Sequence, residues 1–244
     1  MNWRVPRIWE GGDVWILGGG PSVFTQFDIP KEVVTNVLNG TSPPSVYSPY
    51  MQPLHTKHVI GINVAYLIGD WIDMVFFGDG GFFLSHRLRL AQFPGLKVTC
   101  HTGANKDSWV KFLGRDGRHP RGISTAPNLV SWNGNSGAAA ISIAAWSGAK
   151  RIILLGFDMK LSVDNRQHWH DLYGRGVRDP TNDRQRRKLP FDRHLRGFED
   201  IARDAKNWGI EIINASPDSA ITQFPKTTVK DILNEHRPID GGTG

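Results

Sequence analysis

Three histidines in the second half of the chain have the side-chain chemistry of a general acid or base. His168 and His170 flank a tryptophan in a polar segment, Tyr173 follows closely, and His194 precedes a long amphipathic stretch. Because the unperturbed pKa of imidazole lies near neutral, each ring could accept a proton from a hydroxyl group. At the first turn of a helix, the dipole would favour the neutral, basic form of His194. A surface location is the alternative for each histidine.

The spacing of His168 and His170 is also compatible with zinc binding. On an extended segment both rings would point to one side, as metal ligands do. No third ligand is apparent in the sequence, so we expect no metal site there.

A glycine-rich turn follows the first apolar run of the chain. Glycines lack the Cβ atoms that keep an anion away from backbone N–H groups, and a helix that begins beside them directs its positive end to the same place. The spacing is neither the dinucleotide-binding pattern nor a Walker A loop. The turn therefore indicates a phosphate-binding loop, with a plain strand-to-helix turn as the alternative. Its residues are Gly18, Gly19, Gly20, Pro21 and Ser22.

Polar residues follow the other apolar runs or open a helix. Ligands of an open parallel sheet bind beyond the carboxyl ends of its strands, so these residues are the next candidates. Their alternative is local: Asn135 could simply cap a helix, and Asp79 and Asp158 could cap turns rather than bind a ribose, an acceptor or a cation. The nucleotide-binding candidates are Asn63, Asn135, Ser136, Gly137 and Asp158, and the acceptor-binding candidates are Asp79 and Gly80.

The elements that position these residues alternate between strands and helices. The sequence predicts a Rossmann-like, doubly wound α/β fold with a mostly parallel sheet and helices on both faces, formed by residues 1–244 as a single domain. Predicted strands cover residues 13–18, 58–63, 74–78, 96–100, 151–156 and 210–214. Predicted helices cover residues 31–38, 138–146 and one amphipathic stretch from 191 to 208.

The charge of the chain is concentrated in one segment. The net charge is +6, and residues 160–190 hold eight basic side chains against four acidic ones. We expect this segment to be a lid-like insert whose Arg and Lys side chains close over phosphates, or alternatively a solvated loop. No apolar stretch is long enough to span a bilayer and no secretory signal is evident, so a cytoplasmic protein is expected. The single Cys100 is expected in the core.

Five short motifs together resemble a known family. Their order and spacing, from about Val14 to Phe224, are similar to the bacterial sialyltransferases of the Campylobacter type. The same layout occurs in a superfamily that includes 6-hydroxymethylpterin diphosphokinases and uncharacterised tailed-phage proteins. The motifs are Gly18–Val23, Ile62–Asn63, Phe76–Phe83, Asn135–Gly137 with Gly148–Asp158, and Ala215–Ser219.

The resemblance implies roles for individual residues. The glycine turn, Asn63, Ser136 and Gly137 would hold a nucleotide-sugar donor, linked to CMP or UDP. A histidine before the last long helix would be the general base, with a nearby tyrosine assisting the departing phosphate. His194 lies closest to that place, and His170 or His168 is the alternative. Gly19 stands where the family turn usually has asparagine.

Three functions follow as hypotheses. The first is a glycosyltransferase that moves a sugar to a hydroxyl acceptor, which could be a glycan, a small molecule or a modified nucleic acid. The second is an ATP-dependent diphosphokinase in which Asp79 and Asp158 hold Mg²⁺. The third is a non-catalytic phage nucleotide-binding protein. The sequence leaves the oligomeric state open.

Overall fold

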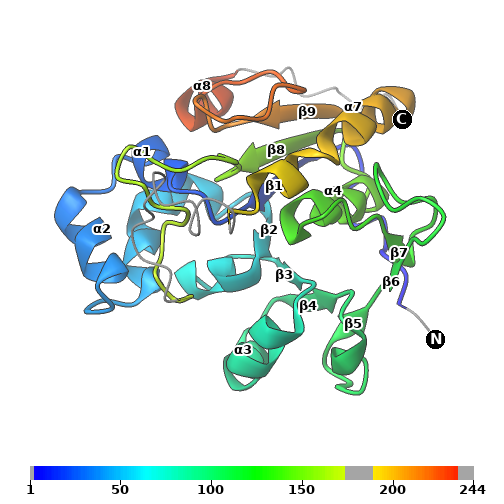
Figure 1. The fold of residues 1–244 in the computed structure, drawn as a ribbon, viewed down its shortest axis with the longest axis horizontal. Helices are drawn as coiled ribbons and strands as arrows, with labels where there is room; N and C mark the ends of the chain where they lie inside the picture. The colour runs from blue at the N-terminus through cyan, green and yellow to red at the C-terminus, as the bar shows by residue number, and fades with distance from the viewer. Residues whose placement is uncertain (1–2, 174–188, 236–244) are drawn as a thin grey trace, which may run out of the picture.

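Seven parallel strands form the central sheet, in the spatial order β5-β4-β3-β2-β1-β8-β9 (Figure 1). The computed structural model describes residues 3–173 and 189–235. From β1 the chain adds strands outward to β5 and then returns to the other side of β1 with β8. The direction of winding therefore switches between β1 and β8. The strands are β1 Asp13–Leu17, β2 His58–Ile62, β3 Met74–Phe77, β4 Leu96–Thr99, β5 Lys111–Phe112, β8 Arg151–Leu155 and β9 Glu211–Asn214.

Both faces of the sheet are buried. Alternate side chains of β1 enter different cores: Val14 and Ile16 pack on one face, and Trp15 and Leu17 on the other. All five residues of β8 are buried. Such apolar strands without polar alternation require helices on both sides of a parallel sheet.

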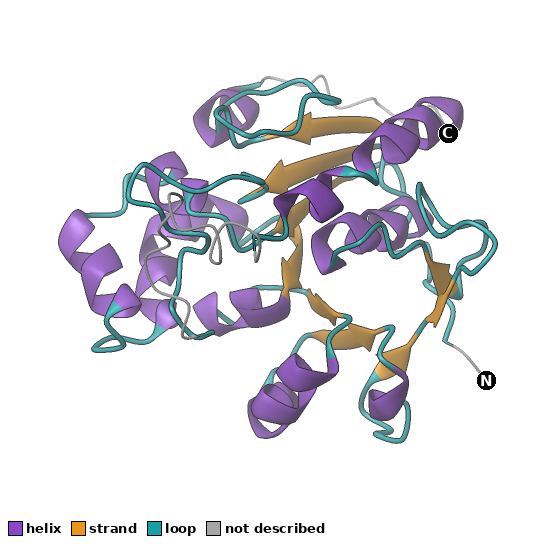
Figure 2. Cartoon of the chain, in the orientation of Figure 1, coloured by secondary structure: helices purple, strands orange, loops and turns teal. Residues whose placement is uncertain are grey.

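Helices cover the two faces as Figure 2 shows. On one face, α4 packs its small apolar side chains across β1, β2 and β3, and α7 lies beside it. On the other face lie α1, α2, α3, α8 and two 3₁₀ segments, η1 and η2. The bounds are α1 Ser22–Gln26, α2 Lys31–Leu38, η1 Pro44–Leu54, η2 Asn63–Ile68, α3 Gly80–Gln92, α4 Ser136–Trp146, α7 Phe198–Trp208 and α8 Val229–Asn234.

The predicted fold class is confirmed, and each of the six predicted strands exists within a residue of its expected bounds. The region from His101 to Ser131, in which the sequence indicated only a possible helical turn near Trp109, contains β5, the 3₁₀ turn η3 Thr102–Ala104, and a two-stranded sheet of β6 Gly114–Arg115 and β7 Leu129–Val130. Strands of two residues are too short to produce a periodic signal.

The prediction of one continuous helix over residues 191–208 is wrong. It forms two helices, α6 Phe191–Leu195 and α7, which are separated at Arg196 and Gly197. Gly197 packs so closely on Asn133 that a Cβ atom there would lie 2.7 Å from the Asn133 side chain. His194 therefore lies in the last turn of α6, and not in the first turn of the long helix.

Six of the eight basic residues of the predicted insert lie outside the described residues: Arg175, Arg178, Arg184, Arg186, Arg187 and Lys188. Within residues 3–173 and 189–235, no helix has both the length and the apolar character that crossing a bilayer requires.

Candidate functional site

The carboxyl ends of the strands form one edge of the sheet, here called the rim. Helices α1 and α4 both begin at the rim, from opposite faces of the sheet. The Phe157 ring lies between their starts: a Cβ atom would lie 3.2 Å from this ring at Gly18 and 2.9 Å from it at Gly137. The glycine turn and the start of α4 are therefore neighbours, but a buried phenyl ring separates them.

On the β8 side of the rim, protein groups occupy the start of α1. The Asp158 carboxylate accepts hydrogen bonds from the Ser22 amide (3.2 Å) and hydroxyl (3.0 Å). The Ser22 hydroxyl also contacts the Ser216 hydroxyl at 2.9 Å. A Cβ atom at Gly20 would lie 1.7 Å from an Asp158 carboxylate oxygen, so this glycine admits a carboxylate of the protein itself. Burial raises the pKa of Asp158. The Asp158 carboxylate therefore caps α1 from a distant part of the chain rather than a local turn.

Two more predicted site residues also cap helices. The Asp79 carboxylate accepts the Phe82 amide (2.9 Å) at the start of α3. The Asn135 side chain accepts the Ala138 amide (2.8 Å) at the start of α4 and donates to the His194 carbonyl (3.2 Å). Ser136 and Gly137 are buried in the first turn of α4. These bonds account for the Asn135 side chain and for one carboxylate oxygen of Asp79 without a ligand.

On the β2 side of the rim, two hydrogen-bonding groups have no partner in the part of the chain that the structure describes. Asn63 has a positive φ of 51° and a buried side-chain oxygen that accepts no hydrogen bond from the described residues. Continuing the register that pairs Leu17 with Gly61 puts Asn63 beside Gly19. No described residue accepts a hydrogen bond from the Gly19 amide. A strained residue with an unpaired buried acceptor is destabilising unless a ligand completes it, and such outliers cluster at functional sites.

The segment Gln167–Tyr173, here called the covering segment, lies on the glycine turn. The Trp169 backbone amide donates to the Gly19 carbonyl (3.0 Å), and the Trp169 indole N–H donates to the Gly18 carbonyl (2.9 Å). These bonds hold His168 so close that a Cβ atom at Gly19 would lie 3.0 Å from its Nδ1. Gly19 therefore gives the imidazole access to the turn.

His168, His170 and Tyr173 form one ring cluster. The two imidazoles stack with centroids 5.1 Å apart, and Tyr173 meets both edge-on, at 5.3 Å from His168 and 4.8 Å from His170. His170 is buried, and its Nδ1 accepts the Leu172 amide at 3.2 Å. A neutral His170 therefore carries its proton on Nε2.

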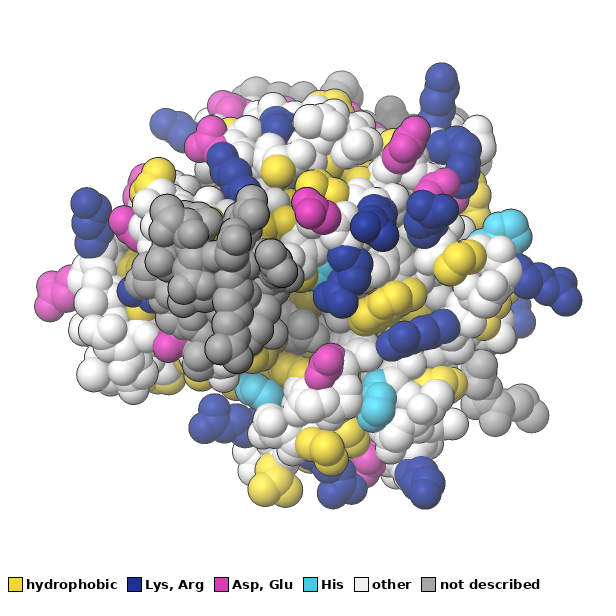
Figure 3. Space-filling view, viewed as in Figure 1, with side chains coloured by type: hydrophobic (Ala, Val, Ile, Leu, Met, Phe, Trp, Pro, Cys, Tyr) yellow, Lys and Arg dark blue, Asp and Glu magenta, His cyan; other side chains and the backbone are white. Residues whose placement is uncertain are grey.

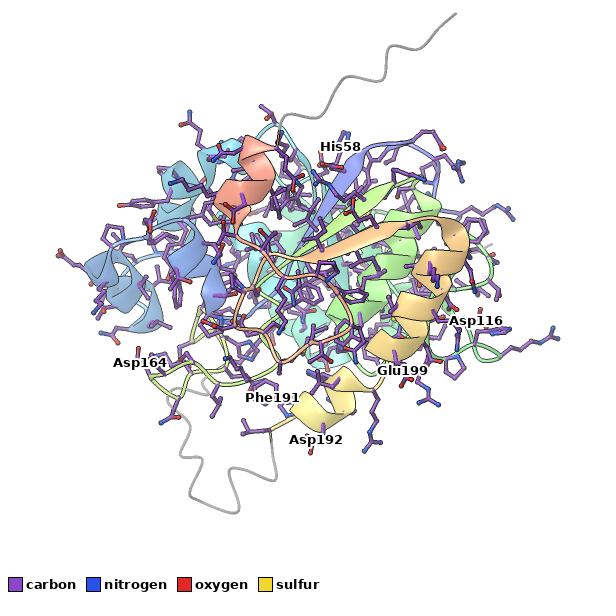
Figure 4. The ribbon with its side chains drawn as sticks, turned by 90° about the horizontal axis from the view of Figure 1, so that it is seen from above. His58, Asp116, Asp164, Phe191, Asp192 and Glu199 are labelled. Carbon is purple, nitrogen blue, oxygen red and sulfur yellow. The ribbon has the colours of Figure 1, made fainter. Side chains whose placement is uncertain are left out.

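His194 lies at the other side of the rim, on α6 next to the start of α4. Its Nε2 lies 3.3 Å from the Arg193 guanidinium. Figure 4 shows α6, with Phe191 and Asp192, beside the beginning of α7. The covering segment and α6 are thus two separate sources of histidine at the rim.

Gln167 of the covering segment was not identified as a site residue from the sequence. Gln167 is 7% exposed, and its side-chain oxygen has no hydrogen-bond partner among the described residues. A glutamine in a polar segment carries no periodic or spacing signal. Only the position of the segment over the glycine turn identifies Gln167.

The two carboxylates of the magnesium hypothesis do not share a site. Asp79 follows β3 and Asp158 follows β8, and β2 and β1 lie between these strands. Three strand spacings amount to about 14 Å, too far for ions that bridge neighbouring phosphate oxygens. In the described part of the chain, no three His, Cys, Asp or Glu side chains are grouped as a metal ion would require.

A depression of about 500 Å³ lies at the opposite edge of the sheet, where the strands begin. Its wall includes Glu10, Lys150 and Trp208 and contains none of the predicted site residues. The two buried side-chain oxygens that lack a partner among the described residues, those of Asn63 and Gln167, are instead at the carboxyl ends of the strands.

No protein-family model and no curated protein matches the chain. Among solved structures, the chain is similar to the sialyltransferase CstII from Campylobacter jejuni in complex with the substrate analogue CMP-3FNeuAc, with 15% identity over 93% of this chain and 89% of that one, and a TM-score of 0.44. A complex of the same enzyme with a trisaccharide acceptor and CMP is 15% identical over 87% of this chain and 84% of that one, with a TM-score of 0.45. A variant of that sialyltransferase in which alanine replaces an asparagine, bound to CMP, is 14% identical over 92% of this chain and 89% of that one, with a TM-score of 0.46.

Proposed function

We propose that this chain transfers a sugar from a nucleotide-activated donor to a hydroxyl group, as a sialyltransferase-like glycosyltransferase. The proposal rests on two hydrogen-bonding groups that follow the neighbouring strands β1 and β2. There the Gly19 amide and the Asn63 side-chain oxygen have no hydrogen-bond partner among the described residues, and the His168 ring lies against Gly19. Ligands of an open α/β sheet bind beyond the carboxyl ends of its strands, and both groups follow such strand ends.

The unpaired groups match the parts of a nucleotide sugar. The Gly19 N–H would donate to a phosphate oxygen, and the Asn63 oxygen would accept a hydroxyl group of the donor. His168 would take the proton of the acceptor hydroxyl, whose oxygen attacks the anomeric carbon. The bond from that carbon to the phosphate oxygen breaks, and the nucleotide leaves with the electron pair. His170 and Tyr173 would fix the His168 ring, and His194 is the second candidate base.

Nucleotide binding is the first test. The similar structures hold CMP, so cytidine nucleotides are the first probe, followed by UDP compounds and by ATP with and without Mg²⁺. A ligand that binds only the folded chain raises its melting temperature. We expect stabilisation by a cytidine or uridine nucleotide without added metal. A requirement for ATP and Mg²⁺ would support the diphosphokinase hypothesis instead.

Turnover of a CMP- or UDP-linked sugar is the second test. His168→Ala should lower the rate about 10²–10⁴-fold, as loss of a general base does, while nucleotide binding is retained. His58→Ala is the control, because this exposed histidine lies on the far side of the molecule from Asp164 and Phe191 (Figure 4). Binding without turnover, unchanged in His168→Ala, His170→Ala and His194→Ala, would favour a non-catalytic nucleotide-binding protein.

A further inference from the structure

Arg115 is an exposed arginine that the structure holds rigidly beside the rim. Its guanidinium lies 4.2 Å from the centroid of the Trp132 ring and donates to the Gly78 carbonyl at 3.0 Å. Trp132 is fixed in turn, because a Cβ atom at Gly78 would lie 2.2 Å from its ring. The guanidinium position is therefore set by an aromatic ring and a strand end.

The charge of Arg115 has no acidic partner in the described part of the chain. The exposed arginines Arg87, Arg121 and Arg203 all form ion pairs with aspartates, whereas Arg115 forms none. Stacking has already restricted the side chain, so an anion that binds it loses less side-chain entropy than with a free arginine. Figure 3 shows further Lys and Arg side chains gathered on this face around α6. The surroundings favour an anionic ligand.

The loop that follows Arg115 is built on a buried carboxylate. Asp116 accepts hydrogen bonds from the amides of Arg118 (3.1 Å), His119 (3.0 Å) and Thr125 (3.1 Å), and from the Thr125 hydroxyl (2.7 Å). This network fixes the backbone next to Arg115. It also leaves Arg118 exposed on the same loop, outside the contacts with Trp132 and Gly78.

A carboxylate and an imidazole belong to or contact the turn whose Gly78 carbonyl accepts the hydrogen bond from Arg115. Asp79 directly follows Gly78 and is exposed; one carboxylate oxygen caps α3, and the other makes no hydrogen bond with described residues. The His101 ring approaches the same turn, 2.7 Å from the position of a Cβ atom at Gly80. A cation beside a free carboxylate oxygen suits a molecule that carries both an anionic group and a hydroxyl group.

We infer that Arg115, which stacks on Trp132, binds the acceptor together with Asp79 and His101, and that the acceptor is an anionic sugar. Arg115 binds its phosphate or carboxylate group, and Asp79 accepts one of its hydroxyl groups. The inference rests on the proposed function, because β3 lies two strand spacings, about 10 Å, from β1 and its glycine turn. A sugar bound there can direct a second hydroxyl group toward the donor.

Three sugars of matched size test the inference: glucose 6-phosphate, glucuronate and glucose. The readout is the indole N–H resonance of Trp132 in an NMR titration at constant ionic strength, assigned with Trp132→Phe. We expect one or both charged sugars to shift this resonance and glucose to leave it unchanged. The comparison of the two charged sugars identifies phosphate or carboxylate as the preferred group.

Two arginine variants separate a specific site from general attraction. Arg115→Gln should weaken binding of the charged sugar about tenfold, the loss of a charge-assisted hydrogen bond, and Arg118→Gln should leave it unchanged. Thermal unfolding of both variants confirms that each is folded. No response to either charged sugar, or equal weakening by Arg118→Gln, would overturn the inference.

The same titrations repeated with CMP distinguish the two proposals. If the charged sugar binds but no nucleotide does, the anionic-sugar site stands and the nucleotide-sugar function fails. If CMP binds and neither charged sugar does, only the acceptor inference fails.

Discussion

The two sides of the rim differ in whether the protein supplies its own hydrogen-bond partners. On the β8 side, Asp158, Ser22 and Ser216 form a closed network around the start of α1. On the β2 side, the Asn63 oxygen and the Gly19 amide have no partner among the described residues. Both sides follow strand ends and both are polar, so polarity does not distinguish a structural position from a binding position. Unused hydrogen-bonding capacity does.

The comparison predicts that substitutions on the β8 side reduce stability, whereas those on the β2 side reduce ligand binding. The largest expected effect on stability is that of Asp158→Ala. Removing the buried carboxylate leaves the Ser22 amide and hydroxyl without their charged acceptor, which should lower the free energy of unfolding by about 3 kcal/mol. Denaturant unfolding measures this, with Asp164→Ala as the control because Asp164 is exposed (Figure 4). An equal effect of both substitutions would remove the distinction.

Neighbouring glycines give the second test. Gly20→Ala places its Cβ atom 1.7 Å from the Asp158 carboxylate and 2.6 Å from the Gly156 carbonyl, so overpacking should lower stability by about 2 kcal/mol. Gly19→Ala meets only the His168 ring, at 3.0 Å. We expect it to be the milder change for stability and the more damaging one for nucleotide binding, measured by calorimetry. The opposite order for stability would contradict the account.

The pH dependence of stability should identify the Asp158 carboxyl. Burial raises its folded-state pKa above the ordinary 3.8. Between the unfolded and folded pKa values the folded state binds more protons, so stability is highest below the unfolded pKa and falls as pH rises through the folded pKa. The fall is about 1.4 kcal/mol per unit of pKa difference. Asp158→Asn should abolish it, and an unchanged pH profile in this variant would contradict the assignment.

The fold was predictable from the sequence because strands that are buried on both faces appear as short, continuous runs of apolar residues. The apolar runs around Val14, Ile60 and Ile153 reflect strands covered on both sides, and the small residues of α4 reflect close packing across three strands. The division between α6 and α7 was not predictable. It depends on contact between Gly197 and Asn133, which are distant in sequence.

The location of the candidate site was predictable from the sequence. Which of its polar residues cap helices and which are left open for a ligand was not predictable. Strand-end positions led to Asn63, Asp79 and Asp158 alike. Only the tertiary structure shows that Asp158 caps α1 and Asp79 caps α3, while the Asn63 oxygen has no partner within residues 3–173 and 189–235. Gln167 was missed because the bonds of Trp169 to Gly18 and Gly19, which are distant in sequence, place its segment over the glycine turn. Arg115 was missed because its position depends on stacking against Trp132.

The smallest expected change in stability belongs to the substitution that tests the account most directly, Asn63→Gly. Glycine adopts the φ of 51° without strain, so the free energy of unfolding should change by less than about 1 kcal/mol. Binding of CMP, measured by calorimetry, should weaken about tenfold with loss of the side-chain oxygen. Asn165→Gly, at a φ of 56° in another turn, should leave binding unchanged. Undiminished CMP affinity in folded Asn63→Gly protein would contradict the assignment of the β2 side of the rim as the ligand site.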